Sequence, residues 1–475
     1  MRRIAIVGGG ISGLTAAYTL AQARARGVPI SEFLIEGSDR LGGVIRTDVL
    51  EGFVLEGGPD SFISEKPEAA SLCYELGLGD SLVGSNDEGR QTYILYNGNL
   101  VPLPEGVMLL TPTRVWPVLS SPLLPLRGKL MVATEWFVTP TKPRDTDESI
   151  AAFVRRHFGN AMLDNIVEPL LAGVYGGDAK SLSVESVLPR FREMEHRYGS
   201  LIRGASAARR QRKKTVRSGA RGEPDVSSLF VTLRGGLGEL VKALEACLDP
   251  SRVHLGQRVV AVDRVDRQWN SPYRIRCEGG QTYEADALVL ALPVYECANF
   301  FASLRSDLTE AFRAIPYSSA ITVNLGFDEE VAAKLPPGFG FLVPRKEPSR
   351  LLACTFVHNK FPHRAPEGKA LLRCFLGGTR DPEVFELSNN EIILRIRQEL
   401  RTILGVDALP LFSRISRWPS AMAQYTVGHG DKIVRIMNLI QKYPRLYLAG
   451  NAYSGIGISD CIRTGRDAAV RAMEM

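Results

Sequence analysis

The chain has 475 residues, and its 58 Lys and Arg against 52 Asp and Glu give a formal net charge of +6. Hydrophobic residues make up 45% and charged residues 23%, which is typical of a globular protein, and the length predicts roughly two or three domains. The seven cysteines are scattered without a Cys-x-x-Cys pair, which excludes a disulfide framework or zinc site and predicts a reducing, cytoplasmic location. The sequence contains no run of about 20 uncharged apolar residues, so no transmembrane helix is predicted. The positive charge favours an anionic partner, but no segment resembles a nucleic-acid-binding module.

The first predicted unit is a strand, a glycine turn and a helix over residues 3–17, with the sequence RIAIVGGGISGLTAA. In this Gly-x-Gly-x-x-Gly pattern Gly8 permits the turn, Gly10 lets the backbone approach a pyrophosphate, and Gly13 lets the helix pack on the strand. Residues 31–35 predict a second strand, and Glu36 at its end is placed to hold a ribose hydroxyl. The alternative is an ordinary glycine turn followed by a surface glutamate.

Two more glycine-rich segments follow at 37–47 and 55–61, and Arg40 and Arg46 can supply positive charge to phosphate. Three such segments suit a long extended ligand better than a nicotinamide dinucleotide. This stretch resembles the flavin-dependent amine oxidase superfamily and, within it, the bacterial FAD-dependent porphyrinogen oxidases of haem synthesis.

The resemblance covers nearly the whole chain and implies an α/β fold of the amine oxidase and p-hydroxybenzoate hydroxylase-like type. A Rossmann-like FAD domain is expected from 1–89, 227–296 and 443–475. A mixed-sheet substrate domain is expected from 90–109 and 297–442. A helical insertion is expected over 110–226, where the resembling enzymes have a helical membrane-associating domain.

Two stretches of the insertion leave alternatives open. Residues 108–138 are apolar and contain tryptophan, basic residues and prolines; composition alone favours a buried helical subdomain, whereas the resemblance favours a membrane-interface surface. Residues 203–221 carry eight Lys and Arg and no acid, which predicts a solvated basic loop. The alternatives for that loop are a funnel for a polycarboxylate substrate or a patch for anionic lipid.

The C-terminal region predicts a strand over 446–453 and a turn leading into a helix over 454–469. In two-domain flavin oxidases the N-terminus of this helix faces the pyrimidine and ribityl end of the flavin, and its dipole stabilises the anionic reduced form. The two flavin motifs lie at opposite ends of the chain, so together they are more specific than either alone.

The resemblance and the glycine segments together assign candidate site residues. The residues predicted to bind FAD are Gly8, Gly9, Gly10, Ile11, Ser12, Gly13, Glu36, Gly37, Arg40, Gly42, Gly43, Val44, Gly58, Pro59, Asp60, Ser61, Val259, Ala291, Trp418, Gly450, Ile456, Gly457 and Ile458. The candidates to line the substrate site are Lys66, Arg90, Thr92, Gly173, Tyr425 and His429, of which the last two are equally readily structural residues. No catalytic acid–base residue and no metal ligand is predicted.

The resemblance implies a six-electron oxidation of protoporphyrinogen IX or coproporphyrinogen III to the porphyrin, with hydride transfer to flavin N5 and molecular oxygen as acceptor. Residues 93–104 predict a hairpin with Asn97-Gly98 as its turn. Plant and animal protoporphyrinogen oxidases place an arginine, which pairs with a substrate carboxylate, just before the matching hairpin. Thr92 occupies that position here, and Arg90 is close but offset. The choice between the two substrates therefore stays open.

Two rival functions remain. One is another flavin oxidase or desaturase of this superfamily with an amine or carotenoid-type substrate, and the other is a non-catalytic, escort-like binding protein. The predicted partner is a porphyrinogen with propionate carboxylates, and no nucleic acid is expected. Contacts with a membrane surface, with the neighbouring haem-pathway enzyme and with a second copy of the chain stay open.

Overall fold

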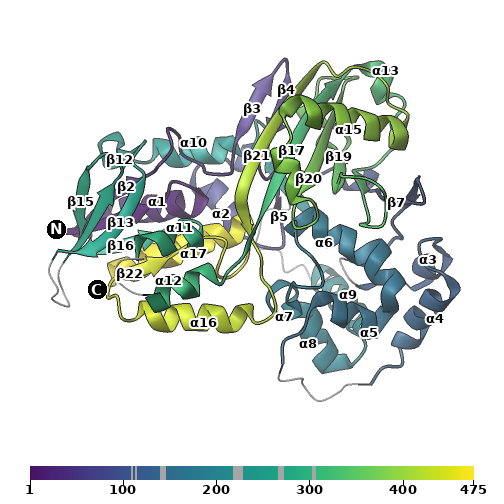
Figure 1. Cartoon of the computed structure of the whole chain (residues 1–475), viewed down its shortest axis with the longest axis horizontal. Helices are drawn as coiled ribbons and strands as arrows, with labels where there is room; N and C mark the ends of the chain where they lie inside the picture. Colours follow the sequence, from purple (N-terminus) through teal and green to yellow (C-terminus); the bar gives the residue numbers. More distant parts are fainter. Residues whose placement is uncertain are drawn as a thin grey trace.

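The computed structural model describes residues 1–108, 111–112, 115–139, 146–217, 228–265, 272–301 and 306–474. They form a cofactor half, a second half built on a large mixed sheet, and a helical insert over residues 115–217 (Figure 1).

The cofactor half is built on a five-stranded parallel sheet whose strands come from the start, middle and end of the chain. Its order is β12 (Val253–His254), β2 (Ile30–Ile35), β1 (Arg2–Val7), β16 (Ala287–Leu290) and β22 (Leu446–Leu448). All four residues of β16 are buried, as expected for a parallel strand covered on both faces. The helices α1 (Ile11–Ala25), α2 (Glu68–Glu75), α10 (Gly238–Ala246) and α17 (Ile458–Met473) share one apolar core with this sheet.

The other face of the parallel sheet packs on an antiparallel layer. This layer contains β13 (Val259–Arg264), β14 (Tyr273–Cys277) and β15 (Thr282–Ala285), and α11 (Val294–Phe300), α12 (Ser306–Arg313) and α16 (His429–Ile440) join the same core. Smaller strands complete this half: β3 (Thr47–Leu50), β4 (Phe53–Glu56), β5 (Phe62–Ile63), β6 (Leu82–Gly84) and β11 (Phe230–Leu233).

The second half is a seven-stranded mixed sheet. Its order is β21 (Phe412–Ala423), β17 (Tyr317–Phe327), β20 (Ala370–Gly377), β19 (Ala353–Phe356), β18 (Gly340–Leu342), β7 (Thr92–Tyr96) and β8 (Asn99–Pro102). The β7–β8 hairpin turns at Asn97 and Gly98, both with positive φ, as the sequence predicts. The helix α15 (Asn389–Leu404) begins at a capping box formed by Ser388 and Glu391 and buries one face in the core of this sheet.

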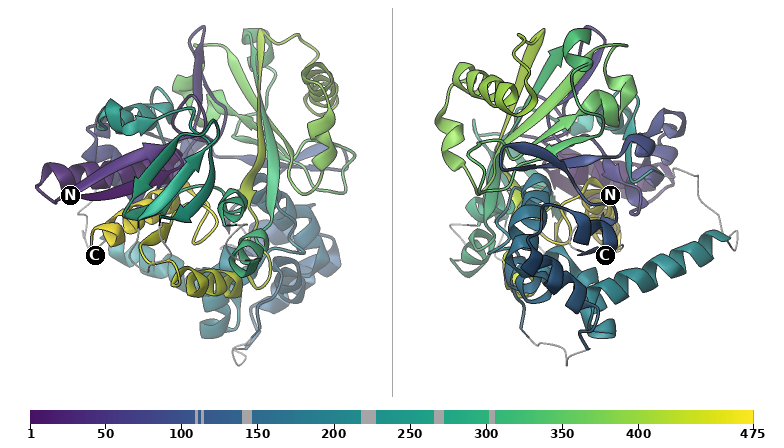
Figure 2. Two further views of the ribbon diagram at one scale, coloured as in Figure 1. Left: turned by 60° about the vertical axis from the view of Figure 1, so that its left-hand side comes forward. Right: turned by 90° about the vertical axis from the view of Figure 1, so that its right-hand side faces the viewer.

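The helical insert lies beside the mixed sheet and corrects one expectation. It contains α3 (Val115–Ser120), α4 (Leu126–Glu135), α5 (Ile150–Met162), α6 (Glu168–Tyr175), α7 (Val184–Val187), α8 (Pro189–Tyr198) and α9 (Leu201–Arg217). The loop predicted over 203–221 is wrong as far as Arg217, because α9 runs through it and projects from the insert (Figure 2, right). Ala, Arg, Lys and Gln are strong helix formers, so a high charge density does not prevent a helix here. Residues 218–227 lie outside the described part of the chain.

Within the described ranges, no helix combines the length and the apolar character needed to cross a membrane. The same ranges contain no cluster of His, Cys, Asp and Glu arranged to hold a metal ion.

Candidate functional site

The first glycine turn follows β1 and leads directly into α1. Gly8 has φ +106°, and a Cβ there would lie 2.4 Å from the carbonyl oxygen of Ala291. A Cβ on Gly13 would lie 1.8 Å from the carbonyl oxygen of Gly8, so only glycine allows the helix to pack this closely on the turn. At Gly10, by contrast, a Cβ would meet no atom within 4 Å. The backbone at Gly10 therefore faces open space at the N-terminus of α1, where free N–H groups and the helix dipole favour an anion.

Glu36 lies beside this turn at the end of β2. One of its carboxylate oxygens accepts a hydrogen bond from Gly9 N at 2.6 Å, and the other accepts from Ser38 N at 2.8 Å. Gly37 packs against Arg258, and Val259 follows as the buried first residue of β13. The structure thus brings the second-strand carboxylate and the predicted adenine contact to the same edge of the parallel sheet.

The second glycine segment packs directly on the first. Gly42 N donates to Gly9 O at 2.8 Å, and a Cβ on Gly43 would lie 3.1 Å from the Cα of Gly10. The guanidinium of Arg40 donates to the carbonyl oxygens of Gly43, Leu41 and Ile45. These hydrogen bonds show that the side chain of Arg40 stabilises the turn.

The third glycine segment is fastened to the second half of the molecule. A Cβ on Gly58 would lie 1.8 Å from the carbonyl oxygen of Val44, so this turn packs on the second segment. The carbonyl oxygen of Gly57 accepts from Thr322 Oγ1 at 2.5 Å and from Trp418 Nε1 at 2.7 Å. Nearby, Asn324 Nδ2 donates to Glu56 O at 3.0 Å. Thr322 and Asn324 were not predicted from the sequence, because no local motif marks these positions on the distant strand β17.

The C-terminal turn brings the N-terminus of α17 to the same region. Gly450 follows β22 with φ +127°, and its N–H donates to Thr464 Oγ1. Gly457 is the N-cap of α17, and its N–H donates to the carboxylate of Asp460. Lys66 Nζ binds both oxygens of that carboxylate, at 2.6 and 2.7 Å. The side chain of Lys66 as a whole is 50% exposed.

Tyr425 and His429 are buried behind the C-terminal turn. Tyr425 Oη donates to Asn451 O and accepts from Gly455 N, both at 2.8 Å. The rings of Tyr425 and His429 stack with centroids 3.9 Å apart, and burial lowers the pKa of His429 to about 4. In this arrangement Tyr425 cross-links the turn that leads into α17, and His429 packs as a neutral ring behind it.

The remaining substrate-site candidates lie on different elements. Arg90 is exposed just before β7, and Thr92 begins that strand, where its carbonyl oxygen accepts from Leu103 N. Gly173 lies on α6, where a Cβ would be 3.1 Å from Leu342. Among the charged candidates, Asp60 does not face open space, because it is enclosed by Lys360 and arginines of the second half.

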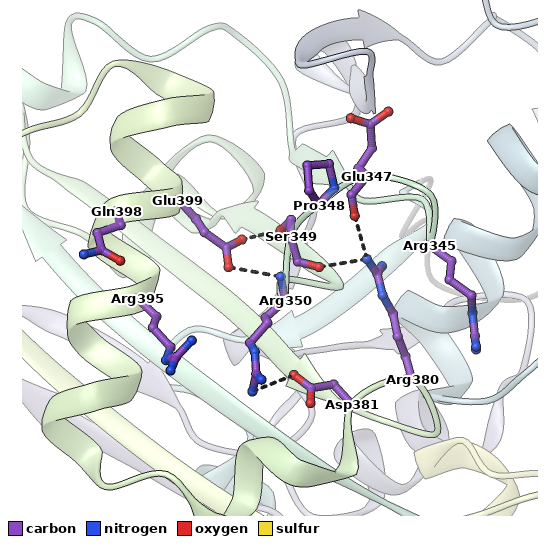
Figure 3. A pocket seen from close by; sticks show the side chains of 10 residues that line it. All are labelled: Arg345, Glu347, Pro348, Ser349, Arg350, Arg380, Asp381, Arg395, Gln398 and Glu399. Atoms are coloured by element: carbon purple, nitrogen blue, oxygen red, sulfur yellow. Dashed lines mark hydrogen bonds and ion pairs between the residues drawn. The ribbon is translucent and has the colours of Figure 1, made fainter.

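A surface cavity of about 520 Å³ lies away from these turns, between α15 and the loop after β18 (Figure 3). Its lining residues are Arg345, Glu347, Pro348, Ser349, Arg350, Arg380, Asp381, Arg395, Gln398 and Glu399. Arg350 pairs with Asp381, and Arg380 donates to backbone carbonyl oxygens. Four arginines and three acids line the cavity, and two of the arginines are already engaged by these contacts.

The cradle formed by the three glycine segments and the α17 N-terminus fits FAD, because backbone alone lines its most crowded points. The profile of the flavin containing amine oxidoreductase family matches residues 11–473. The chain belongs to this family of FAD-dependent oxidoreductases, and both the predicted fold class and the predicted cofactor are confirmed.

Its curated relatives point to a narrower group. The coproporphyrinogen III oxidases of Bacillus subtilis and Staphylococcus aureus are 34% and 32% identical to this chain, covering 99% and 98% of it and 98% of each relative. Protoporphyrinogen oxidase 1 of Arabidopsis thaliana is 28% identical over 98% of this chain and 87% of its own length. A solved structure from Exiguobacterium sp., with a provisional protoporphyrinogen oxidase name, superposes with a TM-score of 0.86 at 30% identity and covers 100% of this chain and 99% of its own.

Proposed function

We propose that this chain uses bound FAD and molecular oxygen to oxidise a porphyrinogen to the porphyrin in haem synthesis, and that its substrate is coproporphyrinogen III. The observation that carries the proposal is the full-length similarity to three coproporphyrinogen III oxidases at 32–34% identity, against 28% for the chloroplast protoporphyrinogen oxidases. Thr92, in place of the plant arginine, agrees with this assignment.

In this proposal the protein mainly positions and shields the reactants. Gly10 and the N-terminus of α1 would hold the pyrophosphate of FAD, Glu36 would hold the ribose, and Val259 would contact the adenine. The N-terminus of α17 would stabilise the flavin. FAD supplies the electron acceptor for the substrate, and the chain's residues bind, orient and exclude water. Lys66, whose side chain is 50% exposed and whose ammonium pairs with Asp460, is one candidate for a propionate carboxylate, and the exposed Arg90 is a second.

Porphyrin fluorescence tests the reaction directly. The purified yellow protein is mixed in air with coproporphyrinogen III and, in parallel, with protoporphyrinogen IX. We expect porphyrin and hydrogen peroxide to form together above autoxidation, with a kcat/KM at least about tenfold higher for coproporphyrinogen. A preference for protoporphyrinogen would reverse the substrate assignment. A yellow protein inactive on both would favour an amine or desaturase substrate, and a colourless one an escort-like role.

A peripheral membrane contact is a second part of the proposal, supported by exposed apolar residues on α3, on α4 and just after the end of α4. Trp116, Leu126, Leu130 and Phe137 are 78%, 82%, 64% and 77% exposed. Arg127 and Lys129 lie on the same helix, α4, and a tryptophan-bearing apolar surface with basic residues suits the headgroup region of an anionic bilayer. We define this α3–α4 surface by the four apolar residues named here.

Flotation with anionic phosphatidylglycerol-containing liposomes tests the α3–α4 surface. The double variant Trp116→Ser, Phe137→Ser should lose most of the floating fraction and keep its flavin. Leu409→Ser serves as the matched control, because Leu409 is 73% exposed but lies elsewhere, near the end of α15. Equal flotation of all three proteins would contradict the proposal. Contacts with the neighbouring pathway enzyme and with a second copy remain predictions.

A further inference from the structure

Five charged side chains are buried together where the third glycine segment meets the mixed sheet. Glu56, Lys360, Arg364 and Arg373 are only 2%, 8%, 1% and 3% exposed, and the side chain of Asp60 is 15% exposed. Lys360 ends α14 (Val357–Lys360), and Arg373 lies on β20. We call these five residues the junction cluster. Sequence analysis identified only Asp60, and as a cofactor contact.

The cluster is held by direct pairs across the junction. Lys360 Nζ lies 3.1 and 3.2 Å from the two carboxylate oxygens of Asp60. Arg364 donates to Glu56 Oε1 at 3.0 Å, to Asp60 O at 3.1 Å and to Thr232 Oγ1 at 2.6 Å. Arg373 lies 3.7 Å from the Asp60 carboxylate and donates to the carbonyl oxygen of Gly58. Each pair joins the cofactor half to the second half.

The charges of the junction cluster do not balance. Three cations face two carboxylates, and within 4 Å these cations meet no other carboxylate in the described part of the chain. The Nε atoms of Arg364 and Arg373 are buried without a hydrogen-bond partner there. Burial raises the pKa of Glu56 and lowers the pKa of Lys360 and of Arg373, so it disfavours the charged forms on both sides of the cluster. An uncompensated buried charge is unfavourable by itself, so a counter-charge from outside the chain is expected.

A series of direct contacts connects the junction cluster to the glycine turns. Arg373 binds the carbonyl of Gly58, Gly58 packs on Val44, and the neighbouring Gly43 packs on Gly10 at the first glycine turn. These contacts link the buried cations to the glycine segments assigned to FAD. At a separation of about 10 Å and an effective dielectric constant of about 20, one fixed charge changes an equilibrium by about tenfold.

We propose that the junction cluster is the fixed positive charge that stabilises the negative charge gained by FAD on reduction, in addition to the dipole of α17. Lys360, Arg364 and Arg373 act through space and touch no substrate, so they are electrostatic positioning residues. The inference rests on FAD binding at the glycine segments and holds for any substrate that the enzyme oxidises.

Sulfite affinity of the FAD-loaded protein tests this proposal without porphyrinogen. Sulfite adds to oxidised flavin and leaves the ring anionic, so its dissociation constant reports how well the site stabilises that charge. Lys360→Met should weaken sulfite binding about tenfold, which is about 30 mV in the midpoint potential of a two-electron couple. Glu56→Gln should strengthen sulfite binding, because it removes a negative charge. Arg373→Lys keeps its charge and should stay within about twofold of the parent protein.

The opposite signs of the two changes separate electrostatics from loosened packing. Weaker sulfite binding in both Lys360→Met and Glu56→Gln would overturn the proposal. So would unchanged sulfite binding in proteins that lose affinity for FAD, since the cluster would then serve the pyrophosphate alone. If Lys360→Met does not fold, Lys360→Gln and the midpoint potential of Glu56→Gln decide. A failed porphyrin assay with a normal sulfite result would reject the substrate and leave this inference standing.

Discussion

The cofactor half and the helical insert reach fixed geometry by different means. In the cofactor half, backbone meets backbone: Gly13 lies against Gly8, Gly43 against Gly10, and Gly58 against Val44. In the helical insert, buried charged side chains from separate helices hold one another. The backbone contacts can be predicted from short glycine motifs, whereas the contacts between buried charges depend on residues that only the fold brings together.

The insert cluster shows this second kind of order. It comprises Glu135 of α4, Arg156 and His157 of α5, Arg192 and Glu195 of α8, and Glu148 just before α5. Glu135 is 1% exposed and accepts from Leu201 N at 2.6 Å, from Ile202 N at 3.2 Å and from Ser200 Oγ at 2.8 Å. Its carboxylate therefore caps the N-terminus of the basic helix α9 from another helix.

The charge of the insert cluster depends on His157. His157 Nδ1 lies 3.1 Å from Glu135 Oε1 and His157 Nε2 lies 3.4 Å from Glu195 Oε1, so protonation of His157 adds a positive charge between two carboxylates. Burial alone would lower the pKa of His157, but its hydrogen bonds to Glu135 and Glu195 raise it above the ordinary value. The junction cluster contains no histidine. Burial would raise the pKa of Asp60, but the positive charges of Lys360, Arg373 and Arg364 hold that pKa well below its usual value.

We expect the largest effect from a variant that disrupts the backbone contacts of the cofactor half. Gly13→Ala places a methyl group 1.8 Å from the carbonyl oxygen of Gly8, so α1 must shift. We expect a loss of about 3 kcal/mol in the free energy of unfolding and loss of FAD. Gly10→Ala is the matched control: its methyl group meets no protein atom within 4 Å, so the apoprotein should keep its stability while FAD binding weakens. Denaturant unfolding and flavin absorbance measure both, and equal loss of stability in the two variants would contradict this account.

The next effect breaks the side-chain order of the insert. Glu135→Gln keeps the shape of the side chain but removes the charge that Leu201 N, Ile202 N and His157 all meet. We expect about 2–3 kcal/mol lower stability of the insert, because hydrogen bonds to a buried charge are lost. Hydrogen exchange should show reduced amide protection at the start of α9 and unchanged amide protection in α1. Glu330→Gln, which removes an exposed partner of Lys334, should leave protection unchanged.

A smaller effect, dependent on pH, sharpens the contrast between the two clusters. Because the folded pKa of His157 is raised, its stabilisation is complete below about pH 6.5 and is lost as the pH rises through that pKa, by about 1.4 kcal/mol per unit of elevation. For Asp60, whose pKa is lowered, stabilisation is complete above about pH 4 and is lost only in stronger acid. Between pH 6.5 and 9, protection factors in α5 should fall while those in α1 stay level. His157→Gln should remove this slope; an unchanged slope would assign it to another group.

These differences explain how far the sequence alone could lead. The glycine turns, the strand before Glu36 and the hairpin at Asn97 and Gly98 follow from local rules of φ and packing, and each appears where it is predicted. Three features were out of reach of local rules: the hold of Thr322 on Gly57, the enclosure of Asp60 by Lys360, and the capping of α9 by Glu135. Each joins residues far apart in the chain, and a single charged residue in a sequence does not indicate its partner.

The predicted basic loop failed for a related reason, since charge was given more weight than helix propensity. On the projecting helix α9, Arg209 and Arg210 are exposed. Exposed arginines can attract an anionic substrate through long-range electrostatics.

We expect the smallest effect from neutralising the two exposed arginines on α9. Arg209 and Arg210 are exposed on α9, so Arg209→Gln with Arg210→Gln should lower kcat/KM for coproporphyrinogen about two- to threefold at low salt. The difference should vanish at high ionic strength, where screening removes attraction beyond a few ångströms. Arg401→Gln, which neutralises an exposed arginine on α15, is the matched control and should have no effect. If the double variant instead loses only liposome flotation and keeps kcat/KM at every salt concentration, α9 serves the membrane surface, because steering of substrate must appear in the association rate.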